Sequence, residues 1–157
     1  MKKWMTMLLV LALVLTGGSG AAKECTDSLG RSAALPEEIT RVAVTGPLAQ
    51  IAVFAVAPDL LAGISGAWDE SSLDIVGAYA DLPVLGQLYG GKGEMNLEAV
   101  AAAAPEVIID VGEPKDGISE DLDALSAQLG IPVLHVTMTT ATAPDAFRML
   151  GQLLGRE

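Results

Sequence analysis

The sequence has 157 residues, of which 51% are hydrophobic and 4% aromatic, and its formal net charge is −11. A chain of this length and composition can bury one hydrophobic core, so we expect a single folded domain. The strong negative charge argues against nucleic acid as a partner, because phosphate backbones bind surfaces that are rich in lysine and arginine.

The first 22 residues have the three parts of a secretory signal peptide. A short basic start at residues 1–4 precedes an uninterrupted apolar run at 5–15, and small residues follow. The apolar run is shorter than the roughly 20 residues that a membrane span requires. We therefore predict cleavage after Ala21 or Ala22, with export to the periplasm or to the outer face of the cytoplasmic membrane. The alternative is a buried N-terminal helix.

The end of this region looks like a lipoprotein signal without its lipid-bearing residue. Leu15, Thr16 and Gly17 match the first three positions of a bacterial lipobox, but Gly18 stands where the cysteine should be. The single cysteine, Cys25, follows two charged residues, which do not suit the lipoprotein peptidase. With no second cysteine in the chain, we expect Cys25 to be a small apolar strand residue, with a reactive thiol as the alternative.

The next segment predicts a small hairpin followed by a buried strand. Residues 27–30, with the sequence DSLG, form a turn signal between two short segments. Pro36 ends the second segment, and residues 41–45, RVAVT, are typical of a short buried strand.

A repeated pattern then indicates the fold class. A helical segment ends at a breaker, and an apolar β-rich run follows; the breakers are Pro58, Pro105 and residues 130–132. The runs at 106–111 and 133–137 are continuously apolar or β-branched, as in strands that are buried on both faces of a parallel sheet. Alternating strands and helices predict an α/β fold, a three-layer αβα sandwich with a mainly parallel, Rossmann-like sheet.

Several residues mark where the helices should begin. Asn96 and Ser119 have the side chains of N-cap residues. Thr142 and Asp145 match the spacing of a capping box, and Pro144 suits the first turn of the same helix.

Residues 86–93 nearly match the phosphate-binding loop GxxxxGK[ST]. Gly93 stands where the loop needs a hydroxyl to ligate Mg²⁺. A helix should also begin directly after such a loop, whereas the expected helix begins near Asn96. We interpret the glycines as a flexible turn. A nucleotide-binding α/β enzyme lobe built around Gly86 and Gly93 is the alternative of a different class.

The sequence offers little for metal or hydrolytic chemistry. Zinc and manganese sites need two or three histidines or a histidine–carboxylate cluster, and His135 is the single histidine. It lies in an apolar run, so we expect a sheet histidine whose hydrogen bonds are satisfied within the fold, rather than a metal ligand. Asp110, Glu113 and Asp116 are expected to form a solvated acidic loop and a cap. There is no GxSxG motif, so we predict no catalytic site, no metal and no cofactor.

Three stretches carry a resemblance to a known family. They are TDSLGR…LPEEITRVAV, APDLLAGIS and MNLEAVAAAAPEVIID. They resemble the N-terminal lobe of the substrate-binding proteins of ABC importers for ferric siderophores, haem and cobalamin. The resemblance covers residues 27–157. Family members hold their ligand in a cleft between two lobes that one long helix joins. The last helical segment, apolar from Phe147 to Leu154, has no strand after it, so we expect residues 23–157 to be one lobe with the C-terminal lobe absent.

The resemblance implies a docking role for Glu98. In the family, the glutamate of an N-L-E motif pairs with arginines on the membrane permease, and Asn96, Leu97 and Glu98 match this motif. An exposed carboxylate in the first turn is stabilised by the helix dipole, and one such charge can orient docking. The alternative is an ordinary exposed glutamate.

The resemblance also implies that ligand contacts lie at the carboxyl ends of the strands, where doubly wound sheets bind their ligands. Trp68 and Tyr89 are the best candidates, because large aromatics in glycine-flanked loops can stack on a macrocycle or a siderophore. Lys92 could meet an anionic chelate. The full candidate set is Thr45, Trp68, Tyr89, Lys92, Glu113, Lys115 and Met138. Each of them could instead be a surface or packing residue.

The sequence thus predicts a monomeric, non-enzymatic solute-binding component of an ABC importer. It would capture an iron(III)–siderophore complex and deliver it to the membrane permease. A cobalamin or haem carrier of the same family is the alternative within the class. The nucleotide-binding enzyme lobe and a degenerate fragment without a ligand are the alternatives outside it.

Overall fold

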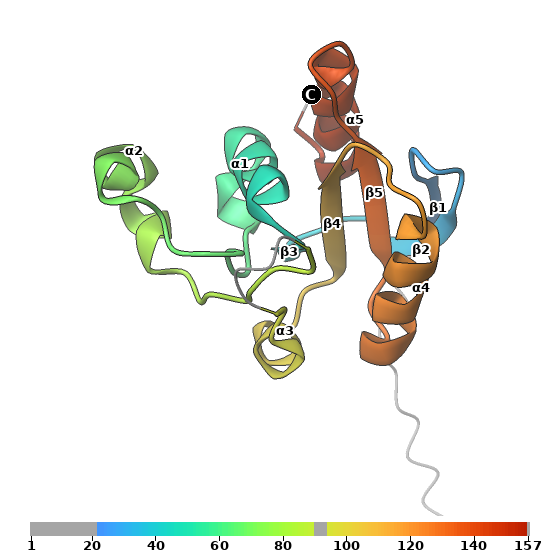
Figure 1. The fold of residues 1–157 in the computed structure, drawn as a ribbon, viewed down its shortest axis with the longest axis horizontal. Helices are drawn as coiled ribbons and strands as arrows, with labels where there is room; N and C mark the ends of the chain where they lie inside the picture. The colour runs from blue at the N-terminus through green and yellow to red at the C-terminus, as the bar shows by residue number, and fades with distance from the viewer. Residues whose placement is uncertain (1–21, 90–93, 157) are drawn as a thin grey trace, which may run out of the picture.

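The computed structural model describes residues 22–89 and 94–156 of the chain. Its centre is a parallel sheet in the order β3-β4-β5, formed by Val42–Val44, Val107–Gly112 and Val133–Thr137. Helices lie on both faces of this sheet (Figure 1). The predicted three-layer α/β fold is confirmed, and the strand at 133–137 has the predicted bounds.

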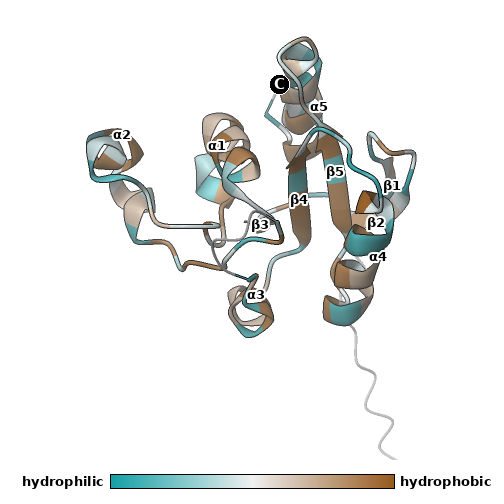
Figure 2. Cartoon of the chain, viewed as in Figure 1, coloured by the Kyte–Doolittle hydropathy of each residue, from teal (hydrophilic) through white to brown (hydrophobic). Residues whose placement is uncertain are grey.

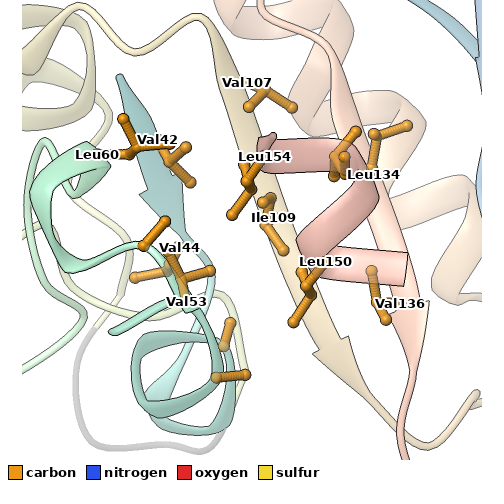
Figure 3. Close-up of a cluster of buried hydrophobic side chains, with 14 of the residues drawn as sticks. Val42, Val44, Val53, Leu60, Val107, Ile109, Leu134, Val136, Leu150 and Leu154 are labelled. Atoms are coloured by element: carbon orange, nitrogen blue, oxygen red, sulfur yellow. The ribbon is translucent and has the colours of Figure 1, made fainter. Parts of the chain in front are cut away.

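Helices α1 (Pro47–Val56) and α5 (Ala143–Leu154) cover one face of the sheet. Alternate strand residues such as Val44, Ile109 and Val136 point toward them and form the larger core cluster (Figure 3). These three side chains are fully buried. Each contributes on the order of 1.5–3 kcal/mol by leaving water.

Helices α3 (Leu97–Ala103) and α4 (Ile118–Leu129) cover the other face. The intervening strand residues, among them Ile108 and Val133, pack there against the apolar sides of the two helices. Figure 2 shows β4 and β5 as apolar strands, each crossed by a polar band. The polar residues Asp110 and His135 lie buried in these two strands.

The helix starts agree only in part with the sequence prediction. Asn96 is the N-cap of α3, and its side-chain oxygen accepts a hydrogen bond of 3.0 Å from the backbone N–H of Ala99. Ser119 was predicted as the N-cap of the next helix, and this is wrong. The N-cap of α4 is Gly117, with φ of 79°, so Ser119 lies inside the first turn. Glycine adopts this left-handed conformation without the strain that a side chain would bring.

The predicted capping box of α5 does not form. Thr142 is the N-cap residue, but its side chain makes no capping hydrogen bond. Its hydroxyl accepts instead from the backbone N–H of Thr139, at 2.9 Å. Asp145 pairs with Arg148 one turn further along the helix. Both side chains of the predicted box therefore bond to other residues, Thr142 to Thr139 and Asp145 to Arg148.

The predicted N-terminal hairpin is confirmed as β1 (Ala22–Thr26) and β2 (Ser32–Pro36), which pair antiparallel. The turn docks on the free edge of β5, where Asp27 accepts a hydrogen bond of 3.1 Å from the backbone N–H of His135. The hairpin thus covers a sheet edge that would otherwise be open.

The strand expected after Pro58 is not a strand in the structure. Pro58–Leu60 forms a 3₁₀ turn, and the chain beyond it makes isolated bridges from Leu61 to Val42 and from Ile64 to Val84. The backbone N–H of Ala62 donates to Val42 of β3, whereas that of Ile64, two residues later, donates to Pro83 on the other side of the segment. Because the partner changes, no continuous ladder of hydrogen bonds forms, and the prediction of a strand after Pro58 is wrong. The bridges still extend the sheet beyond β3.

Residues 65–82 form a chain of short turns beside α1. They contain the 3₁₀ turns Glu70–Ser72 and Gly77–Asp81 and the four-residue helix α2, Leu73–Val76. Figure 1 shows this segment standing away from the sheet. Among the described residues, no helix is long and apolar enough to cross a membrane. The predicted signal peptide, including Gly18, lies outside the described residues apart from Ala22.

Candidate functional site

The candidate site lies where β3, β4 and β5 end. Because the three strands are parallel, their carboxyl ends lie at the same edge of the sheet. The structure thereby brings the chain at Thr45, Glu113 and Met138 to one edge, as predicted. Glu113 is exposed, whereas Met138 is half-buried and packs against the larger core cluster.

A row of buried polar side chains crosses the sheet just below this edge. Asp110 lies opposite His135 in the register, and Thr45 follows the last paired residue of β3. The Thr45 hydroxyl donates to one carboxylate oxygen of Asp110, and Nδ1 of His135 lies 2.6 Å from the other oxygen. All three residues are at most 5% exposed. The hydroxyl of Thr45 is therefore already committed inside the lobe.

This row refines two predictions. His135 is a buried sheet histidine, as expected, but its hydrogen bonds are only half satisfied, because its Nε2 atom has no hydrogen-bond partner within the described residues. Asp110 was expected in a solvated acidic loop, and this is wrong, because it is buried as the partner of His135. Glu113 and Asp116 are exposed, as expected. The signal for the pair was present: both residues interrupt apolar strands at the same distance from the strand ends.

Tyr89 and Lys115 meet at the carboxyl edge. The Tyr89 hydroxyl donates to Asp121 of α4 at 3.3 Å, and the Lys115 ammonium lies 5.3 Å from the centre of the Tyr89 ring. The loop is fastened by the backbone N–H of Leu88, which donates to the carbonyl of Thr45 at 2.8 Å. An aromatic face and a cation are thus placed together at the edge, in reach of solvent.

The surroundings of Tyr89 keep its phenol protonated. Burial raises the pKa of Tyr89, and the negative charges of Asp121 and Asp110 raise it further. Both effects disfavour a phenolate near other negative charges. The side chain, neutral at neutral pH like any tyrosine, therefore stays a hydrogen-bond donor and a neutral stacking surface in alkaline solution as well.

Trp68 lies against α1. Its ring packs at a centroid distance of 5.1 Å on Phe54, which also contacts Tyr79 at 5.8 Å, both in edge-to-face geometry. The Trp68 side chain is half-buried. These contacts give Trp68 a packing role between helix α1 and the turns at residues 65–82. Its contact with a ligand stays a prediction, and Lys92 lies outside the described residues.

The geometry around Gly86 does not resemble a phosphate-binding loop. Gly86 has φ of 79°, and a Cβ atom there would lie 2.3 Å from the carbonyl oxygen of Glu94. Glycine is needed at this point because two backbone segments cross closely at the base of a loop. Helix α3 begins at Leu97 and has only 7 residues. The described residues therefore offer no observation in favour of the nucleotide-binding alternative.

Glu98 is exposed in the first turn of α3, whose N-terminus Asn96 caps. It forms no ion pair with another residue in the described ranges 22–89 and 94–156. Within the same ranges, no group of three or more histidine, cysteine, aspartate or glutamate side chains is placed to hold a metal ion.

A groove of about 750 Å³ runs beside the start of α3. One wall is a single face of α4, with Asp121, Ala124 and Gln128 one turn apart, and the other wall includes residues 87–89 and Leu97. We call it the α4 groove. Of the predicted ligand residues, Tyr89 lines it. The sequence prediction did not find this groove, because it arises from the packing of a loop against a helix face.

Comparison with known proteins places this architecture in a structural class. No family model matches the chain, and no curated protein matches it. Among solved structures, an ABC transporter solute-binding protein from Sulfurospirillum deleyianum matches with a TM-score of 0.72 and 27% identity, covering 85% of this chain and 42% of that one.

Two further structures share the fold at lower identity. The TroA-like periplasmic binding protein FepB from Veillonella parvula matches with a TM-score of 0.61 and 22% identity, covering 85% of this chain and 43% of that one. The heme-binding protein HmuT matches with a TM-score of 0.55 and 19% identity, covering 86% of this chain and 41% of that one.

These likenesses define the class to which the fold belongs. The described residues form a lobe of the kind found in the periplasmic solute-binding proteins of ABC transporters, in agreement with the N-terminal lobe that the sequence resembles. The chain spans 42% of the length of the Sulfurospirillum structure.

Proposed function

We propose that this protein is the extracytoplasmic solute-binding component of an ABC importer, which captures an iron(III) complex such as a ferric siderophore and delivers it to the membrane permease. The observation that carries the proposal is the likeness, over 85% of the chain, to an ABC transporter solute-binding protein at 27% identity. The heme-binding protein HmuT shares the fold, which favours haem as the first alternative ligand, ahead of cobalamin.

The lobe would act by binding and closure, with no covalent step. Tyr89 offers a neutral aromatic face, and the Lys115 ammonium beside it suits an anionic chelate. A second lobe would supply the opposite wall of the cleft, and ligand bound to both lobes would favour the closed form. Glu113 and Met138 lie at the same edge and complete the candidate contacts.

Delivery requires export and docking. We propose residues 1–22 as the signal peptide. Cleavage after Ala21 would leave the described residues of β1, Ala22–Thr26, in place. Glu98, exposed and free of ion pairs within the described residues, would pair with an arginine on the permease and orient the loaded protein.

Intrinsic fluorescence tests the ligand class. The two tryptophans of the chain are Trp4 and Trp68, so Trp68 alone reports from this lobe once the signal peptide is removed. We expect a ferric siderophore to quench the fluorescence of the mature protein with saturation, and haem and cobalamin to do so weakly or not at all. Saturable binding of haem or cobalamin instead would select that alternative. If calorimetry with all three compounds detects no binding, the carrier function is wrong.

A further inference from the structure

The α4 groove has the chemistry of a docking surface for a basic segment. Its floor is apolar, with Leu125 buried and Leu88 and Met95 half-buried as part of the smaller core cluster. Carboxylates stand on both walls, Glu94 on the loop and Asp121 on α4. No lysine or arginine is among the described residues that line it. A ligand with apolar groups and a positive charge fits this combination.

The groove lies beside the start of α3, to which the proposed function assigns the contact with the permease. Leu97 lines it, and the next residue, Glu98, is exposed. The chain as a whole carries a net charge of −11, which attracts a basic partner at long range. The small side chain of Ala124, exposed on α4, keeps the wall open. The α4 groove has a volume of about 750 Å³, which accommodates several side chains of a protein segment.

We propose that the α4 groove receives a segment of the permease surface that presents a basic side chain next to apolar ones. This inference rests on the proposed function and deepens it. Glu98 alone would give one charge pair, which orients a complex but adds little affinity at an exposed site. An apolar anchor in the groove supplies the desolvated contact that typically carries most of the binding energy of an interface.

Two matched pairs of variants of α4 test the inference. Ala124→Leu fills the groove, whereas Ala127→Leu adds the same side chain at an exposed position of the same helix that does not line it. Gln128→Lys places a positive charge in the groove, and Ala127→Lys places one beside it. Leucine and lysine are good helix formers, so the folded helix tolerates all four changes.

The measurement is the affinity of the ligand-free mature protein for its purified permease–ATPase complex in nanodiscs. We expect Ala124→Leu and Gln128→Lys to bind about tenfold more weakly than the wild type, and both variants of Ala127 to bind within about twofold of it. Thermal melting confirms that the variants are folded, and the affinity for a ferric siderophore should not change.

The outcomes separate this inference from the function on which it rests. If the wild-type protein does not bind the permease complex, both are wrong. If the wild type binds and Ala124→Leu binds equally well, the groove inference alone is wrong. If Ala124→Leu keeps its affinity for the permease but loses that for the siderophore, the groove belongs to the small ligand, which also overturns the inference.

Discussion

Asp27 shows how one side chain can join two parts of the lobe. Its carboxylate accepts hydrogen bonds from the backbone N–H groups of Leu29 and Arg31 at 2.9 Å, from the Arg31 guanidinium at 2.6 Å, and from the backbone of His135 at 3.1 Å. Burial alone would raise the pKa of Asp27, but these hydrogen bonds outweigh it and hold the pKa below its ordinary value. The charged carboxylate therefore stabilises the folded state.

Asp27→Asn should destabilise the protein by about 2–4 kcal/mol, because an amide offers one acceptor oxygen and places donors against the Arg31 guanidinium. Urea unfolding at neutral pH measures the loss. Asp123→Asn is the control, since Asp123 bonds the same guanidinium from an exposed position and should cost at most about 1 kcal/mol. Equal losses in the two variants would contradict the role given to Asp27.

The lowered pKa of Asp27 also predicts a pH dependence. A carboxylate with a lower pKa in the folded state adds stability above its unfolded pKa of about 4, and this stability is lost as the pH falls through the folded pKa. The free energy of unfolding of the wild-type protein should therefore fall below about pH 4. In Asp27→Asn the share of this fall that comes from protonation of Asp27 should be absent.

At the scale of elements, the sequence predicted what local patterns determine. The strand at 133–137 and the hairpin turn were correct, because continuous apolar runs and turn residues act locally. The segment after Pro58 has the same apolar character, yet it forms only bridges, because its partners change along the chain. The sequence does show one polar residue in each of two apolar strands, Asp110 and His135, but their position opposite one another depends on strand register, which a single sequence does not fix.

The loop that begins at Gly86 gives a prediction at this scale. Gly86→Ala should destabilise the protein by about 1–2 kcal/mol for its left-handed backbone and by a further 1–3 kcal/mol or so for the clash with Glu94. Gly30→Ala is the matched control, because Gly30 has φ of 80° with nothing within 4 Å of an added Cβ. Denaturant unfolding of both variants isolates the second contribution, and equal losses would show that the loop base can relax.

At the scale of the whole molecule, the two proposals assign different surfaces of the lobe to different tasks. The carboxyl edge, with Tyr89 and Lys115, offers an aromatic face and a cation for the proposed ligand. The start of α3, with Glu98, and the α4 groove offer negative charge and an apolar floor for the proposed permease contact. Tyr89 belongs to both regions, since its ring meets Lys115 and its hydroxyl bonds Asp121. A ligand that moves Tyr89 would therefore alter one wall of the groove.

The division of tasks predicts that Glu98→Ala separates binding from transport. Glu98 is exposed, and its loss removes no contact at the carboxyl edge, so the affinity for a ferric siderophore should stay within about twofold of the wild type. Uptake of the labelled complex by cells should fall about tenfold or more, because the charge that is proposed to orient docking is gone. Glu120→Ala, at another exposed glutamate in a first helical turn, is the control and should leave both quantities unchanged. Loss of siderophore affinity in Glu98→Ala would place this residue in the ligand site and refute its role in docking.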